Sequence, residues 1–128
     1  MSTTASRIGE INLVMIPSTD QDRSIEFYET LGFEKRTDIP FGGRYRWVEV
    51  YPPRGTTGIA LAPPREGDPT GIQTGISLTT DDIDATHARL KASGVDVDAE
   101  VARMGEPVPP MFWLRDPDGN TLLIVEQN

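Results

Sequence analysis

Glu49 is the side chain of this sequence with the clearest potential for chemistry. The stretch Arg44–Tyr51 predicts a β-strand, and because residues two apart share one face of a strand, Tyr45 and Trp47 lie on the same side as Glu49. A carboxylate held among aromatic rings can bind a cationic ligand or act as a general base. The alternative is a structural ion pair with one of three arginines, Arg46, Arg103 or Arg115.

Other catalytic arrangements have little support in the sequence. His87 is the only imidazole, but its predicted place on a helix face turned towards a sheet favours a packed, structural side chain. No serine has a histidine and an aspartate visibly placed to activate it. The chain has no cysteine, which excludes disulfides, thiolate metal sites and a cysteine nucleophile.

Two segments could be mistaken for ligand-binding loops. Asp116-Pro117-Asp118-Gly119 lacks the later ligands of a calcium loop and has the spacing of a turn between strands. Gly42-Gly43 is too short and too isolated for a phosphate-binding loop. We interpret both segments as turns.

The elements that position these residues follow a pattern that occurs twice. Three residues of the first copy, Asp20, Asp22 and Gly32, recur 62 positions later as residues of the same type (82 − 20, 84 − 22 and 94 − 32). Their counterparts in the second copy are Asp82, Asp84 and Gly94. Each copy predicts an apolar strand, a helix that begins at acidic residues, and a glycine that ends the helix. Two similar modules around a shared cleft are therefore expected.

The predicted elements divide the chain into a tail, two modules and a linker. Residues 1–7 form a loose N-terminal tail, residues 8–62 the first module, residues 63–71 a linker rich in proline and glycine, and residues 72–128 the second module. The predicted strands are Ile11–Ile16, Glu34–Asp38, Arg44–Tyr51, Ile59–Ala62, a strand through Gly75, Val95–Val97, Met111–Arg115 and Asn120–Glu126. Because halves of roughly 60 residues are marginal alone, we expect a single α+β domain from residue 8 to residue 128.

Composition narrows the classes of partner. Twelve basic and twenty acidic side chains give the 128-residue chain a formal net charge of −8, which opposes non-specific nucleic-acid binding. No apolar run is long enough to cross a membrane, and the N-terminus lacks the apolar segment of a signal peptide. We expect a cytoplasmic protein with a small-molecule partner, and no partnership with nucleic acid or membrane.

The sequence resembles a known family at several of these positions. The paired modules, the segment Asp20–Phe33 with its Ser24–Tyr28 core, and the closing Asp116–Asn120 are similar to the vicinal oxygen chelate superfamily. That group includes glyoxalase I, bleomycin-resistance proteins, fosfomycin-resistance enzymes, methylmalonyl-CoA epimerase and extradiol dioxygenases. The likeness extends from about Ile11 to Glu126. It implies an α+β fold of two βαβββ modules that form a shared cleft.

The resemblance also implies where a divalent metal would be bound. Its four ligand positions fall on Leu13, on Ala60 or its neighbour Leu61, on Gly75 and on Leu123. None of these side chains can donate an electron pair to a metal. A site of two histidines and a carboxylate is excluded within one chain that has a single histidine. We therefore expect no metal and no other cofactor.

The cleft that the resemblance implies is apolar and aromatic, with one carboxylate. The predicted ligand-binding residues are Leu13, Met15, Tyr45, Trp47, Glu49, Met111, Trp113 and Leu123. The two tryptophans can sandwich a flat ring, while the methionines adapt to its outline. The alternative is that both tryptophans fill a cleft that has closed.

Two functions follow from this set of residues. The first is metal-free capture of a hydrophobic or aromatic metabolite or antibiotic, without chemical change. The second is a lyase or isomerase of the glyoxalase type, independent of metal or with an atypical metal site, in which Glu49 is the general base and an arginine or tyrosine steadies negative charge. The family resemblance also suggests a homodimer, whose cleft is built within one chain or shared between two.

Overall fold

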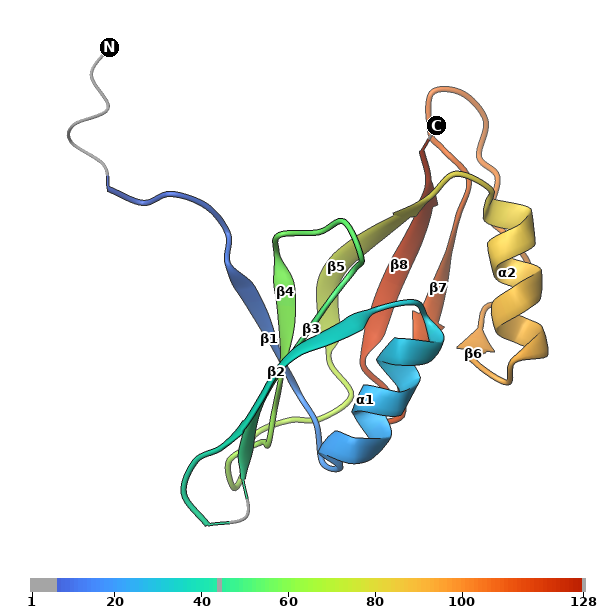
Figure 1. The fold of residues 1–128 in the computed structure, drawn as a ribbon. Coiled ribbons are helices and arrows are strands. Elements are labelled where there is room, and N and C mark those ends of the chain that lie inside the picture. Colours follow the sequence, from blue (N-terminus) through green and yellow to red (C-terminus); the bar gives the residue numbers. More distant parts are fainter. Residues whose placement is uncertain (1–6, 44, 128) are drawn as a thin grey trace.

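The computed structural model describes residues 7–43 and 45–127, which form an α+β fold (Figure 1). The predicted tail lies outside these residues except for Arg7. The described elements are β1 (Leu13–Pro17), α1 (Gln21–Thr30), β2 (Glu34–Pro40), β3 (Arg46–Tyr51), β4 (Gly58–Ala62), β5 (Gln73–Thr80), α2 (Ile83–Ala92), β6 (Asp96–Val97), β7 (Met111–Arg115) and β8 (Thr121–Glu126). Neither of these two helices is long and apolar enough to span a membrane.

The strands form two four-stranded sheets of the same design. The first sheet has the order β1-β4-β3-β2 and the second has the order β5-β8-β7-β6. In each sheet the first strand of the module pairs in parallel with the last, while the other neighbours are antiparallel. The structure thus confirms the predicted pair of βαβββ modules.

The helices begin and end where the sequence predicts. Asp20 and Asp82 are the N-caps, and their side chains accept hydrogen bonds from the backbone N–H groups of Arg23 and Ala85. Gly32 (φ 102°) and Gly94 (φ 86°) follow the helices in the left-handed region, which glycine adopts without steric cost. These signals are readable in the sequence because each depends on neighbouring residues alone.

The observed ends of the strands agree less closely with the predicted ones, because hydrogen bonding to a neighbouring strand determines where each strand ends. The second strand continues two residues past Asp38, where Ile39 pairs with Trp47 and Pro40 pairs with Arg46. Arg44, the predicted start of the third strand, lies outside the described residues. The sixth strand is reduced to Asp96–Val97.

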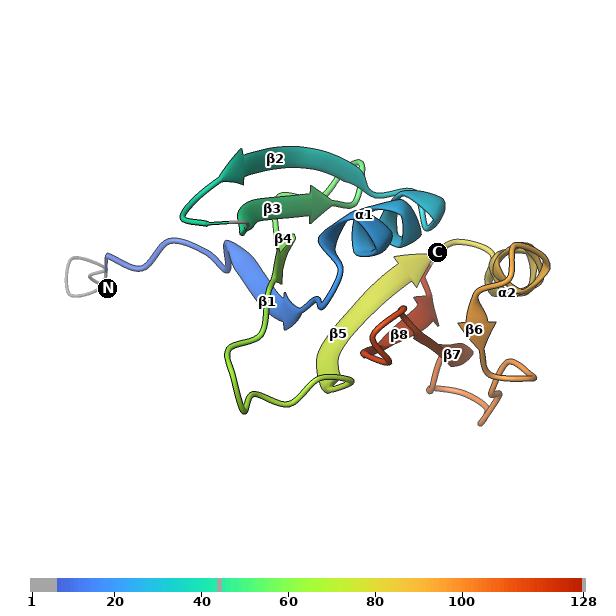
Figure 2. The same cartoon turned by 90° about the horizontal axis from the view of Figure 1, so that it is seen from below.

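The two modules share one hydrophobic core. It contains Ile16, Val48, Val50 and Leu61 from the first sheet, Phe112, Leu114, Leu122 and Ile124 from the second, and Ile25, Tyr28, Ile83 and Leu90 from the helices. Figure 2 shows α1 between the two sheets. Each sheet is therefore covered on its apolar face mainly by the helix of its own module, and the buried residues of the two modules join in one cluster.

A buried polar cluster fastens the second module to the first. The hydroxyl of Tyr28 on α1 donates to Asp116 Oδ2 at 2.8 Å. Asn120 Nδ2 donates to Pro17 O and to Asp116 Oδ2, both at 2.9 Å, and Asn120 Oδ1 accepts from the backbone N–H of Ile72 at 3.0 Å. Tyr28 and Asn120 are fully buried. The segment predicted as a simple turn therefore also joins the modules.

Candidate functional site

Each sheet has a side that is turned away from the shared core, which we call its open face. In the first sheet, Val48 and Val50 enter the core, so Trp47 and Glu49 lie on the open face. The strand register aligns Met15 with Ala60 and Ala60 with Glu49 in one row. Leu61 instead pairs with the buried Ile16, so Ala60 is the position of the fourth strand that shares the open face.

The carboxylate of Glu49 is held by two neutral donors. Trp47 Nε1 donates to Glu49 Oε2 at 2.6 Å, and the Tyr51 hydroxyl donates to Glu49 Oε1 at 2.8 Å. The hydrogen bond to Glu49 raises the pKa of Tyr51, so this phenol keeps its proton to a higher pH than an ordinary tyrosine does. These bonds fix the plane of the Trp47 indole as well as the carboxylate.

The predicted alternative for Glu49, an ion pair with an arginine, is wrong for the three candidates. Their nearest carboxylates are others: Arg46 pairs with Asp22 and Asp38, Arg103 with Asp84, and Arg115 with Asp96 and Asp98. Among the described residues, no cation lies within ion-pairing distance of Glu49. The open face of the first sheet therefore carries a negative charge that these arginines leave available.

Tyr51 is a residue of this site that the sequence analysis did not identify. Its ring lies on Gly58, where an added Cβ would meet ring atoms at 2.7 Å, and the Arg36 guanidinium stacks 4.6 Å from the ring centroid. These contacts position its hydroxyl for Glu49. The available signal was its place two residues after Glu49, on the same face of the strand.

Apolar side chains around Trp47 are exposed in the single chain. Ile39 pairs with Trp47 across the strands, and the Phe41 ring contacts the indole edge-on with centroids 6.4 Å apart. Met15, Ile39 and Phe41 are 64%, 55% and 51% exposed. This surface provides apolar contacts around a ring whose polar edge is already bonded.

Tyr45 does not lie on the strand that carries Trp47 and Glu49. It lies in the turn before β3, where its N–H donates to Gly42 O and its carbonyl accepts from Phe41 N–H. Its side chain lines a polar hollow of about 440 Å³ beside the start of α1, together with Asp20 and Asp22. Strand alternation predicted a common face with Trp47, but the strand begins only at Arg46.

The second sheet has an open face of a different character. Phe112 and Leu114 are buried in the core, and Met111 and Trp113 lie on the opposite side of the strand. Trp113 pairs with Leu123, which in turn pairs with Ser77. Both tryptophans are half-buried, so neither fills a closed interior within the single chain.

Within one chain the two open faces are separate surfaces. Both sheets turn their apolar faces to one core, so their open faces point away from it (Figure 2). Leu13, Met15, Trp47 and Glu49 belong to the first sheet, and Met111, Trp113 and Leu123 belong to the second. The single cleft that would hold both sets stays a prediction.

The remaining predicted positions have limited chemical potential. His87 Nε2 donates to the Asp98 carbonyl at 2.7 Å, and its ring packs edge-on against Phe112 with centroids 4.9 Å apart, as expected of a structural histidine. The side chains at the implied metal positions do not fit a divalent cation, because Leu13, Ala60 and Leu123 are apolar and Gly75 has no side chain.

Comparison with known proteins gives consistent matches over nearly the whole chain. The family model of the Glyoxalase/Bleomycin resistance protein/Dioxygenase superfamily matches residues 10–124. TnmS3, an antibiotic binding protein from Streptomyces sp. CB03234, is 33% identical with a TM-score of 0.81, and the match covers 96% of this chain and 99% of that one.

Two further relatives support the same grouping. A superfamily member from Sphaerobacter thermophilus DSM 20745 is 35% identical with a TM-score of 0.85, over 94% of this chain and 98% of that one. A glyoxylase-like domain-containing protein from Didymella fabae is 26% identical over 121 residues, which are 88% of this chain and 90% of the relative.

Proposed function

This chain belongs to the Glyoxalase/Bleomycin resistance protein/Dioxygenase superfamily, and from that premise we propose that it binds a small aromatic or apolar molecule, such as an antibiotic, without chemical change. The observation that carries the proposal is the first open face, where Trp47 is fixed by Glu49 and lies beside the exposed side chains of Ile39 and Phe41. The similarity to TnmS3, an antibiotic binding protein, supports it.

The proposed ligand is a flat molecule that is neutral or cationic. The indole of Trp47 uses its N–H on Glu49, so its ring face is the part available for stacking. The negative charge of Glu49, in a chain of net charge −8, disfavours an anion at this face. Ile39 and Phe41 supply apolar contacts beside the ring.

The proposal includes a homodimer. Each chain has two open faces that point away from its own core, and a two-fold pair can set the first face of one chain against the second face of its partner. Such a pair contains two identical clefts, each with Trp47 from one chain and Trp113 from the other. This assembly would unite all the predicted ligand-binding residues of β1, β3, β7 and β8.

Binding is favoured over catalysis by the state of Glu49. Both of its carboxylate oxygens already accept hydrogen bonds, from Trp47 and from Tyr51. A general base would have to exchange one of these donors for a substrate proton. The proposal therefore gives Glu49 a role in orienting Trp47 and the ligand, and it uses no metal because the four implied metal positions lack donor side chains.

The test is a titration of tryptophan fluorescence with proflavine, a planar aromatic cation. Trp47→Ala and Trp113→Ala should each weaken binding at least about tenfold, because a stacked aromatic pair and its buried area are lost. Trp47→Phe, which keeps a ring, serves as the matched control and should retain most of the affinity. Unchanged proflavine affinity in both alanine variants would overturn the proposed site.

A further inference from the structure

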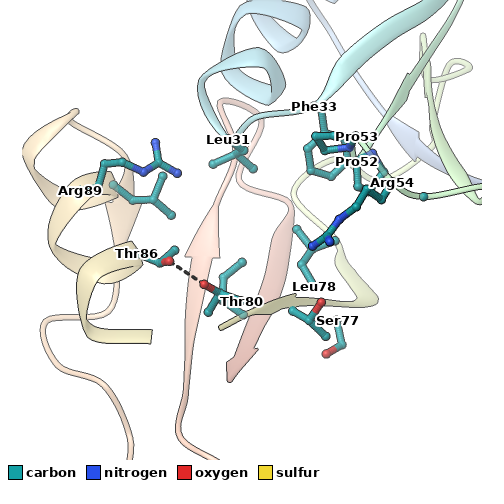
Figure 3. A pocket seen from close by; sticks show the side chains of 14 residues that line it. Leu31, Phe33, Pro52, Pro53, Arg54, Ser77, Leu78, Thr80, Thr86 and Arg89 are labelled. Atoms are coloured by element: carbon teal, nitrogen blue, oxygen red, sulfur yellow. Dashed lines mark hydrogen bonds between the residues drawn. The ribbon is translucent and has the colours of Figure 1, made fainter. Parts of the chain in front are cut away.

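A hollow of about 520 Å³ lies between the two modules (Figure 3). One wall comes from β5 and α2 of the second module, and the other comes from Leu31, Phe33 and the turn Pro52–Gly55 of the first. Its volume falls within the range of about 300 to 1,000 Å³ that is typical of small-molecule sites. The sequence analysis did not predict it, because its walls are far apart in the chain.

The base of this hollow is apolar. Phe33, Leu90 and Ile124 are 7%, 1% and 5% exposed and form part of the shared core. Leu31 and Leu78 are half-buried and extend the apolar surface outwards. The surface can therefore hold a hydrocarbon or aromatic body.

The rim of the hollow carries two arginines from opposite walls. Figure 3 shows Arg54, from the first module, and Arg89, from α2, pointing into the hollow. Among the described residues neither pairs with a carboxylate, and Arg89 makes only a long bond of 3.4 Å to the carbonyl of Thr30. None of the residues that line the hollow is acidic. Unpaired guanidinium groups on both sides of an apolar hollow match an anion with an apolar body.

We propose that this hollow is a second binding site, which accepts a small amphipathic carboxylate. The carboxylate binds at the rim, where Arg54 and Arg89 supply positive charge from opposite walls, and the apolar part of the molecule covers Leu31, Phe33 and Leu78. The site differs from the open face of the first sheet in its charge preference, because Glu49 repels the same head group there. Its walls belong to both modules, so an occupant also ties the modules together and raises the thermal midpoint of the protein.

The experiment is isothermal titration calorimetry, which measures the affinity and stoichiometry of decanoate binding to the full chain at low salt. Decanol serves as the uncharged probe of equal chain length. Decanoate should bind once per chain, and the double variant Arg54→Gln/Arg89→Gln should weaken its binding about tenfold, the scale expected when two exposed charge interactions are lost. Arg23→Gln removes the same charge from an exposed position on α1 and should leave decanoate binding unchanged. All three arginines are exposed, so these variants are expected to fold.

Two further measurements distinguish decanoate bound in the hollow from decanoate bound at the open face of the first sheet. Trp47→Ala should leave decanoate affinity unchanged, and decanol binding should be insensitive to the arginine changes. The proposal is overturned if the double variant binds decanoate as well as the wild-type chain does, or if Trp47→Ala removes decanoate binding. It is equally overturned if wild-type protein does not bind decanoate.

Discussion

The centre of the open face differs between the two modules, although their strands have the same order. In the first sheet the row across the strands contains Met15, Ala60 and Glu49, and in the second it contains Ser77, Leu123 and Trp113. Glu49 and Trp113 thus occupy corresponding positions. The repeated backbone places a hydrogen-bonded carboxylate on one sheet and an indole on the other, so a ligand held between such faces would meet a polar side and an apolar side.

The same comparison extends to the turns that follow the third strand of each module. Pro52-Pro53-Arg54-Gly55-Thr56 corresponds to Asp116-Pro117-Asp118-Gly119-Asn120. The second turn carries the buried cluster that joins the modules, whereas Thr56 is exposed and Arg54 reaches the hollow between the modules. Copies of one turn have therefore taken different structural roles.

The largest expected effect comes from breaking the cluster in the second turn. Asn120→Ala should lower the free energy of unfolding by about 3 kcal/mol, because it leaves the partly buried Pro17 carbonyl and Ile72 N–H, and the buried Asp116, without the partner that Asn120 provides. Thr56→Ala, at the corresponding exposed position, should change it by no more than about 0.5 kcal/mol. Urea unfolding measures both, and equal losses would mean that the two turns contribute alike.

A smaller loss of stability is expected from a change on the first helix. Tyr28 there occupies the buried position that the apolar Leu90 occupies on the second helix, and it adds a hydroxyl. Burial, with the nearby negative charge of Asp116 and its hydrogen bond, raises the pKa of Tyr28 far above its ordinary value. The unfolded phenol ionises near pH 10 while the folded one does not, so this contribution to stability is complete below about pH 10 and is lost as the pH rises further.

Tyr28→Phe should therefore cost about 1.5 kcal/mol at neutral pH and reduce the loss of stability above pH 10. Unfolding by urea at pH 7 and at pH 11 gives the comparison. Tyr45→Phe is the matched control, because Tyr45 is 47% exposed and lies outside the core. An undiminished alkaline loss in Tyr28→Phe would show that this hydroxyl is not its source.

The smallest expected effect concerns the charge of Glu49. Glu49→Gln keeps the shape of the side chain but removes its charge, so proflavine binding should weaken about fivefold, the scale of a partly exposed charge interaction. Acridine, which is uncharged at pH 8, should bind both forms with similar affinity. Fluorescence titration separates the two probes, and an equal loss for both would indicate that Glu49 acts only by holding Trp47.

A structural feature can be predicted from this sequence when it depends on residues that are close together in the chain, and not when it depends on how distant segments pack. Helix caps at Asp20 and Asp82 depend on adjacent residues, so they were predictable. The strand Met111–Arg115 is apolar on both faces, so its own pattern does not indicate which side faces the cleft, and the family resemblance supplied that assignment. The direction in which each open face points depends on how the modules pack, and no local pattern records it. The contact of Tyr51 with Gly58 likewise joins two strands, so it emerges only in three dimensions.

The central claim is metal-free binding of a small molecule by a homodimer, and native mass spectrometry tests it most directly. The protein is purified without chelators, and its mass under native conditions is compared with its mass after denaturation. We expect a dimer that carries an organic adduct and no stoichiometric divalent ion. One tightly bound divalent ion per chain would contradict the interpretation of Leu13, Gly75 and Leu123 and would make metal-dependent catalysis the better account.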